Sequence, residues 1–246
     1  MNHPSKLKQG SRVIGEFFLI VISVLVALAV DQYAERREER EQEGQYLVRL
    51  AEDVESTGQS IRTTQGSFLR AEIAARYLDS LLADPPARTP PASTLYIATQ
   101  SASRWYTPTY QKGTLDEMKS VGGLRLVRDQ EVRERVLRFF AWEETHDLLF
   151  DDIDTRFRTF SRSLQIPSSD ERFFETCPPE IHPADCEVNV PGINGEALWL
   201  ELRSSPEVNG MLRHLIRDTY RSQELLSEHL VRADSLVDLL RRVVER

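Results

Sequence analysis

The chain has few of the residues on which catalysis and metal binding depend, with two cysteines, five histidines and four lysines among 246 residues. It also lacks a glycine-rich phosphate loop, an H-E-x-x-H motif and a G-x-S-x-G motif. No signature of a nucleotide-binding loop, a zinc protease or a serine hydrolase is therefore present. Two cysteines are too few for a disulfide-rich scaffold. The net charge of −8 argues against nucleic acid as a partner, because phosphate binding needs clustered Lys and Arg.

One strongly apolar run, residues 13–30, stands out in a chain whose mean hydropathy of −0.41 is that of a soluble protein. Eighteen helical residues measure about 27 Å, close to the hydrocarbon core of a bilayer at about 30 Å. The run therefore predicts a transmembrane helix over residues 13–31.

Two alternatives to a retained anchor are a cleaved signal peptide and a buried core helix. In the first, the basic start would be followed by Ala27-Leu28-Ala29 as the cleavage site. Against cleavage, Glu16 interrupts the start of the run, and the chain continues without a turn-forming break until Pro85. The retained anchor is favoured.

The charge changes sign along the chain, from +3 in residues 1–12 to −1 in residues 13–30 and −10 in the remainder. Basic residues near the two ends of the run nearly balance, but the unneutralised tail of residues 1–12 favours a cytoplasmic N-terminus. We therefore expect a single-pass protein of a bacterial inner membrane, with residues 32–246 in the periplasm.

Cys177 and Cys186 agree with this orientation, since a nearby cysteine pair is more readily oxidised outside the cytoplasm. A disulfide between them would stabilise its small loop by about 2–3 kcal/mol on the chain-entropy model. Two unpaired thiols are the alternative.

One face of the apolar run carries small and polar residues, namely Gly15, Glu16, Ser23 and Ala27. Small residues allow two helices to approach closely in a membrane, so we expect this face to contact a partner helix. Glu16 lies near the start of the run, and the simpler interpretation is that its carboxylate reaches the headgroup layer.

A heptad pattern predicts that the helix continues from Asp31 to about Leu82. Its two seam positions are occupied by Leu47, Val54, Ile61, Phe68, Ala75 and Leu82, and by Leu50, Thr57, Thr64, Ala71 and Leu78. The polar middle suits one helix of a bundle as well as a coiled-coil dimer. Prolines in residues 84–93 then predict a stiff link.

Shorter elements are expected after the link. Residues 94–104 are predicted to form a short helix and residues 105–112 an irregular segment. Thr114 and Glu117 form a capping-box pair that predicts the start of another short helix, which Gly122-Gly123 is expected to end.

Two more long helices complete the expected fold. One opens near Asp129 with a stripe of Val132, Val136, Phe139, Glu143, His146, Phe150, Ile153, Phe157, Phe160 and Leu164. After a predicted loop over 167–205, the other begins with Ser205 as N-cap and Pro206 at its first position, and its seam is Leu226, Leu230, Ala233, Val237, Leu240 and Val244. We expect an all-α protein whose transmembrane helix continues into an extramembrane antiparallel helical bundle.

Glu143 and His146 interrupt the apolar stripe one helical turn apart. A Glu-x-x-His pair binds metal in di-iron carboxylate bundles, where a second such pair and two more glutamates complete the site. This chain has no second copy, so we expect a hydrogen-bonded polar break that fixes helix register. Neither a metal nor another cofactor is expected.

Three segments match a recognisable pattern: Gly15-Glu16 with Leu19 to Arg37, then Tyr46-Leu47-x-Arg49-Leu50, then Thr109-Tyr110-Gln111 through Leu126. The first resembles G-E-x-x-L-I-V-I-G-V-L-I-A-L-Q-V-D-N-W-N-E-x-R, the opening of an uncharacterised bacterial family, with Ser23 in place of Gly and Gln32-Tyr33 in place of Asn-Trp. The resemblance covers about the first 140 residues. It implies a single-pass helical membrane protein and no assigned activity.

These observations favour a non-enzymatic, membrane-anchored protein that binds and stabilises a larger inner-membrane assembly. An energy-transducing respiratory or photosynthetic complex is a conceivable host. The expected partners are the lipid bilayer and other membrane proteins, with a homo-oligomer left open. The alternative is an extracytoplasmic sensor-type bundle that binds a small ligand and acts through a partner. A metal-dependent oxidase built on Glu143 and His146 is the third hypothesis.

Overall fold

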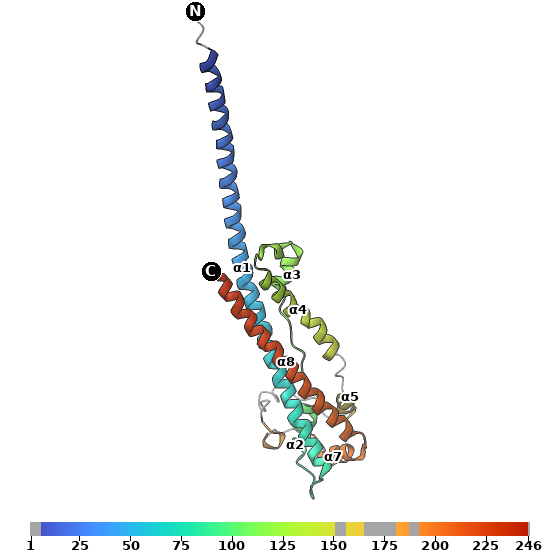
Figure 1. Cartoon of the computed structure of the whole chain (residues 1–246). Helices are drawn as coiled ribbons and strands as arrows, with labels where there is room; N and C mark the ends of the chain where they lie inside the picture. The colour runs from blue at the N-terminus through green and yellow to red at the C-terminus, as the bar shows by residue number, and fades with distance from the viewer. Residues whose placement is uncertain (1–5, 151–155, 165–180, 187–191, 246) are drawn as a thin grey trace, which may run out of the picture.

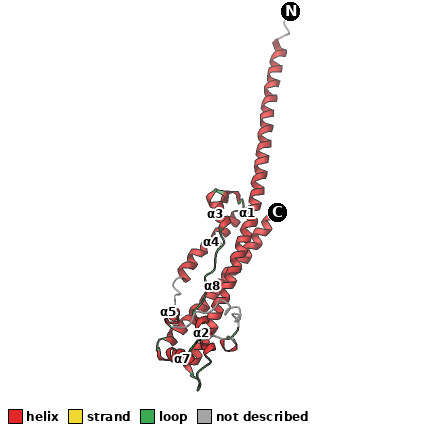
Figure 2. Cartoon of the chain, turned by 180° about the vertical axis from the view of Figure 1, so that it is seen from behind, coloured by secondary structure: helices red, strands yellow, loops and turns green. Residues whose placement is uncertain are grey.

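The computed structural model describes residues 6–150, 156–164, 181–186 and 192–245, and the side chains of 6–18, 20 and 144–150 lie outside the description. Every regular element in these residues is a helix, and none is a strand (Figure 2). The predicted all-α class is therefore confirmed.

Two long helices, α1 (Lys6–Ala83) and α8 (Val208–Val244), form the axis of the molecule (Figure 1). Their ion pairs show that they run antiparallel. Arg241 lies 2.8 Å from Glu55, whereas Arg213 near the start of α8 lies 3.3 Å from Asp79 near the end of α1. Since Arg241 already pairs with Glu55, α8 ends well short of the N-terminal part of α1, which extends alone beyond the bundle.

The predicted seam of α1 forms the core of this pair. Ten of its eleven positions are buried, and only Leu82 is partly exposed. The facing side of α8 contributes buried side chains that include Leu212, Leu226, Ala233 and Leu240. The heptad prediction is confirmed, and α1 ends at Ala83, directly before the prolines.

Four short elements cover the half of the pair that lies far from the N-terminus: α2 (Ala92–Ala102), α5 (Arg156–Ser163), the 3-10 turn η3 (Pro183–Asp185) and α7 (Gly195–Ser204). They enclose one hydrophobic cluster, in which Phe68 of α1 and Leu226 of α8 meet Leu95, Phe157 and Trp199. The predicted short helix at 94–104 corresponds to α2.

The other half of the pair is covered by α3 (Gly113–Ser120), the 3-10 turn η1 (Gly123–Leu126) and α4 (Gln130–Phe150). A second cluster joins Leu47 and Val54 of α1 and Leu240 of α8 to Leu115 and Val136. Figure 1 places α3 and the C-terminus at the end of the bundle from which the N-terminal part of α1 leaves.

An extended segment between α2 and α3 lies against hydroxyl groups of α1, one of which, Thr57, belongs to the polar middle of the seam. Its backbone N–H groups donate to hydroxyl oxygens on α1: Tyr106 to Ser67 at 3.2 Å, Thr109 to Ser60 at 2.8 Å and Gln111 to Thr57 at 3.0 Å. A buried backbone N–H without a partner is costly. At Thr57 the seam therefore has a hydroxyl group because a backbone, and not an apolar helix face, lies against it.

The capping-box prediction at Thr114 is wrong. The helix α3 begins at Gly113, and no side chain within α3 caps it. The Thr114 N–H instead donates to the carboxylate of Asp53 on α1, at 2.9 Å, and Glu117 pairs with Arg49 at 2.5 Å. The acceptor for the backbone N–H at the start of α3 comes from α1, and the spacing of residues within α3 cannot reveal such a distant contact. The predicted turn is confirmed, since Gly122 has φ of +70°.

Three further boundaries differ from the prediction. The expected loop over 167–205 contains α7, which starts where the Asn194 side chain accepts from the Ala197 N–H at 3.1 Å. The last helix begins at Val208, because the Val208 N–H donates to the Ser205 carbonyl in a preceding turn. The stripe that opens near Asp129 belongs to two helices, α4 and α5, in the described residues.

Candidate functional site

The N-terminal part of α1 exposes apolar side chains. Residues 21–30 are exposed without exception, and Leu19 and Leu25 are 68% and 59% exposed. Ten consecutive exposed residues cover every side of a helix. No helix in the described part of the chain has a stretch both long and apolar enough to cross a membrane. Val13 to Phe18 and Ile20, which belong to the predicted span, lie outside the described side chains.

The predicted packing face of this helix is only partly described. Gly15 and Glu16 lie among the residues whose side chains are outside the description. The Ser23 hydroxyl donates to the Leu19 carbonyl at 2.7 Å within the same helix. Ser23 and Ala27 are both exposed, so this face has room for a partner helix.

The Glu143 and His146 pair is not brought together with further metal ligands in the described residues. The Glu143 carboxylate forms an ion pair with Lys112, from the extended segment. The side chain of His146 lies outside the description. No group of three or more His, Cys, Asp or Glu side chains within the described ranges could hold a metal ion.

Of the two cysteines, Cys186 lies in the described residues, where it is buried and disulfide-bonded. Cys177, its predicted partner, lies outside them. Cys186 follows η3, which contacts both α1 and α2 at the end of the bundle far from the N-terminus.

His229 on α8 is a buried titratable residue that the sequence analysis did not select. Its fully buried ring stacks against Phe139 at 4.6 Å and against Trp142 at 4.3 Å, joining α8 to α4. Its position, three residues after Leu226 and four before Ala233, could have identified it as a seam residue. The sequence analysis placed Leu230 there, which is only partly buried.

A charged cleft of about 480 Å³ lies where α1 leaves the bundle, between α1 and η1. It is lined by Glu35, Arg36, Glu39, Arg40, Arg125, Leu126 and Arg128. The buried carboxylate of Glu43 fixes one wall, because it accepts from the Arg128 backbone N–H at 2.8 Å and from the Arg128 Nε at 2.7 Å. The sequence analysis counted the basic residues after the apolar run only for topology, and it could not predict that Arg125 lies across the cleft from Arg36 and Arg40.

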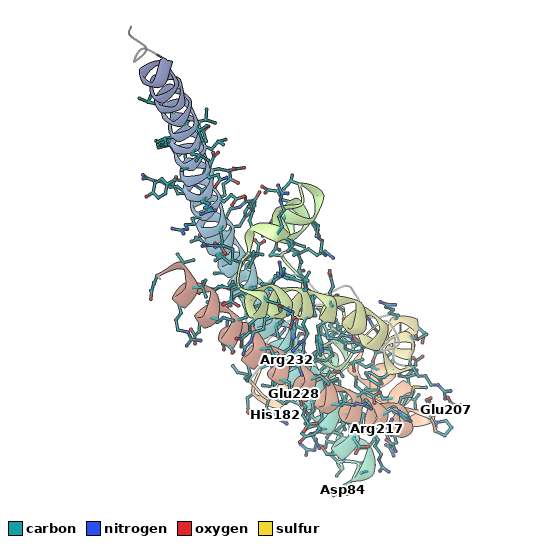
Figure 3. All side chains as sticks on the ribbon, turned by 45° about the horizontal axis from the view of Figure 1, so that its top comes forward. Asp84, His182, Glu207, Arg217, Glu228 and Arg232 are labelled. Carbon is teal, nitrogen blue, oxygen red and sulfur yellow. The ribbon has the colours of Figure 1, made fainter. Side chains whose placement is uncertain are left out.

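A second groove, of about 490 Å³, separates α4 from α8. Its floor contains Phe139 and Leu236, Val231 is 68% exposed beside it, and Arg135, Arg138 and Arg232 line its edge. Arg232 pairs with Glu228 one turn away on α8, at 3.6 Å (Figure 3). The groove thus combines apolar and guanidinium groups.

Comparison with known proteins adds no relative from which a function could be carried over. No family model, curated protein or solved structure matches this chain.

Proposed function

We propose that this protein is a single-pass, membrane-anchored helical bundle, related to the family that its opening resembles, which binds another membrane protein and catalyses no reaction itself. The proposal rests on the N-terminal part of α1, where apolar side chains are exposed on every side over residues 21–30. If this apolar surface stays exposed to water, the protein forgoes about 25 cal/mol of stabilisation for each Å² that could be buried. In lipid the apolar side chains are well solvated, and a helix satisfies its own backbone hydrogen bonds.

The segment that follows supports a charged helical connection between the anchor and the bundle. Residues 31–42 are all exposed, and eight of the twelve are charged. Twelve helical residues span about 18 Å. We propose that the basic tail lies in the cytoplasm and the acidic bundle in the periplasm, where it can contact a larger inner-membrane assembly.

The anchor is tested by a charge placed in the middle of the run. Leu25→Lys should move the chain out of the alkali-resistant membrane fraction, because lysine at the centre of a span costs about 2.5–3.5 kcal/mol. Val231→Lys is the matched control, since Val231 is also largely exposed, at 68%, but lies on the bundle. Leu25→Lys chains that resist alkaline extraction as well as wild type would contradict the anchor.

Partner binding is tested on the small-residue face. Ser23→Leu with Ala27→Leu should reduce the recovery of co-purifying membrane proteins, because larger side chains prevent close helix approach. Val21→Leu with Val24→Leu adds bulk to other faces of the same helix and should leave recovery unchanged. Equal loss in both double variants would show that this face has no special role.

The groove between α4 and α8 favours the sensor-type alternative, with an anionic amphiphile as ligand. Dodecanoate should raise the melting temperature of the wild-type chain, and Arg138→Gln should remove this effect while Arg221→Gln on the far part of α8 keeps it.

The metal-dependent oxidase has no support in the described residues beyond Glu143, whose carboxylate contacts Lys112.

A further inference from the structure

The charged cleft beside η1 contains charged groups of both signs that lack partners. Glu35, Arg36, Glu39, Arg40 and Arg125 form no side-chain ion pair or hydrogen bond with any residue in the described ranges. Neighbouring charges do pair, since Arg37 lies 3.1 Å from Glu41 and Arg128 lies 2.6 Å from Glu43. The cleft therefore presents available donors and acceptors to a ligand.

The charges form rows of opposite sign. Glu35 and Glu39 lie four residues apart, on one strip of α1, and Arg36 and Arg40 form the adjacent strip. Arg125 faces them from η1 across the cleft. A purely anionic ligand would meet the two carboxylates, and a purely cationic ligand would meet the three guanidinium groups. The cleft is complementary to a compact zwitterion.

The end of the cleft nearer the apolar run comes within side-chain reach of the headgroup layer of a bilayer. If the apolar run ends at Val30, Arg36 lies about 9 Å and Arg40 about 15 Å further along the helix. Each headgroup layer is about 5–8 Å thick, and arginine side chains extend several ångströms toward it. Val121, 64% exposed, directly follows α3, and Figure 1 shows α3 at the end of the bundle from which the N-terminal part of α1 leaves.

We propose that this cleft binds the phosphoethanolamine headgroup of a membrane lipid, and this proposal rests on the membrane anchor of the proposed function. The lipid phosphate accepts hydrogen bonds from Arg36, Arg40 and Arg125, since guanidinium groups match phosphate oxygens. The primary ammonium donates to Glu35 and Glu39. A choline headgroup cannot replace it, because its trimethylated nitrogen has no N–H, and a glycerol headgroup has no cation.

The test is lipid retention by the full chain in mild detergent, measured by native mass spectrometry. With equal amounts of phosphatidylethanolamine, phosphatidylcholine and phosphatidylglycerol, wild type should retain the first about tenfold more than either other lipid. Glu35→Gln with Glu39→Gln should abolish this preference, and Arg40→Gln with Arg125→Gln should reduce retention of all three. Glu201→Gln and Arg221→Gln, exposed far from the cleft, are the matched controls.

Two results would overturn the proposal. Equal retention of the three lipids by wild type would show that the ammonium is not recognised. Soluble phosphoethanolamine that binds as tightly as the lipid would assign the cleft to a soluble ligand. Failure of the anchor itself is distinguishable, because the chain would then be extracted by alkali irrespective of these variants.

Discussion

The absence of a side chain at Gly195 allows α7 to lie directly on α2. A Cβ at this position would lie 2.7 Å from the Ala92 Cβ and 2.9 Å from the Ala92 Cα. These Ala92 atoms belong to the backbone or are attached directly to it, so they cannot move aside as the end of a flexible side chain could. The two helices would therefore have to move apart.

We expect Gly195→Ala to lower the free energy of unfolding by about 1–3 kcal/mol, the usual cost of an overpacked contact. Gly210→Ala on α8 is the control, because its Cβ would meet no atom within 4 Å, and it should raise stability by about 0.5–1 kcal/mol. Urea unfolding of both variants measures the difference. An equal change in the free energy of unfolding in both variants would contradict the close contact between Gly195 and Ala92.

Glu117 links α3 to α1 through charge. Its hydrogen bond with Arg49 lowers the pKa of the Glu117 carboxyl and raises the pKa of Arg49, and the Tyr46 hydroxyl also donates to Glu117. A carboxyl whose pKa is lower in the folded state stabilises the fold above its unfolded pKa, and this contribution is lost as the pH falls through the folded value.

The melting temperature of Glu117→Gln should therefore lie below that of wild type at pH 7, by a small amount because the pair is solvent-exposed. The difference should start to shrink as the pH falls below the ordinary pKa of glutamic acid, about 4.3, and should vanish only below the lowered pKa of Glu117 in the folded state. Glu201→Gln, which loses an exposed carboxylate without this contact, should follow wild type throughout. A difference that stays constant from pH 7 to pH 3 would exclude the ionic contribution.

Among the elements, the extended segment after α2 depends on hydroxyl groups of a helix that lies far from it in sequence. Thr57 is fully buried and accepts from the Gln111 N–H, while its own hydroxyl donates to the Asp53 carbonyl at 2.8 Å. An apolar residue of the same shape would leave the Gln111 N–H without a partner.

Thr57→Val should destabilise the protein by about 1–3 kcal/mol, the cost of a buried polar group that loses its hydrogen bond. Thr63→Val is its control, since the Thr63 hydroxyl contacts only the Gln59 carbonyl of its own helix at an exposed position. Its effect should stay within about 0.5 kcal/mol. Amide exchange at Gln111 should accelerate in Thr57→Val alone.

For the whole molecule, the lone N-terminal part of α1 is the feature with the largest consequence. Residues 31–42 are exposed throughout, with η1 across the charged cleft, whereas the seam from Leu47 to Leu78 is buried between α1 and its neighbours. Isolated helices shorter than about 12–15 residues are marginal in water. Stability should therefore fall steeply where α1 leaves the bundle.

Hydrogen exchange of the purified full chain should show fast exchange over residues 31–42 and strong protection over the seam. Added partner, or a second copy of the chain, would slow exchange in the first region only. Equal protection of both regions in a monomeric sample would contradict the arrangement.

The sequence by itself determined the all-α class, the long first helix and its core positions, because a heptad spacing is a local property that burial then satisfies. The heptad spacing did not explain why Thr57 and Thr64 occupy core positions. The sequence analysis also did not predict α7, the burial of His229 or the acceptor at the start of α3. Only the tertiary structure decided these features. The acceptors for the Thr114 and Gln111 N–H groups come from α1, more than fifty residues away. The charged cleft likewise depends on a tertiary contact, because Glu43 binds Arg128 and so helps to keep the segment of Arg125 beside α1.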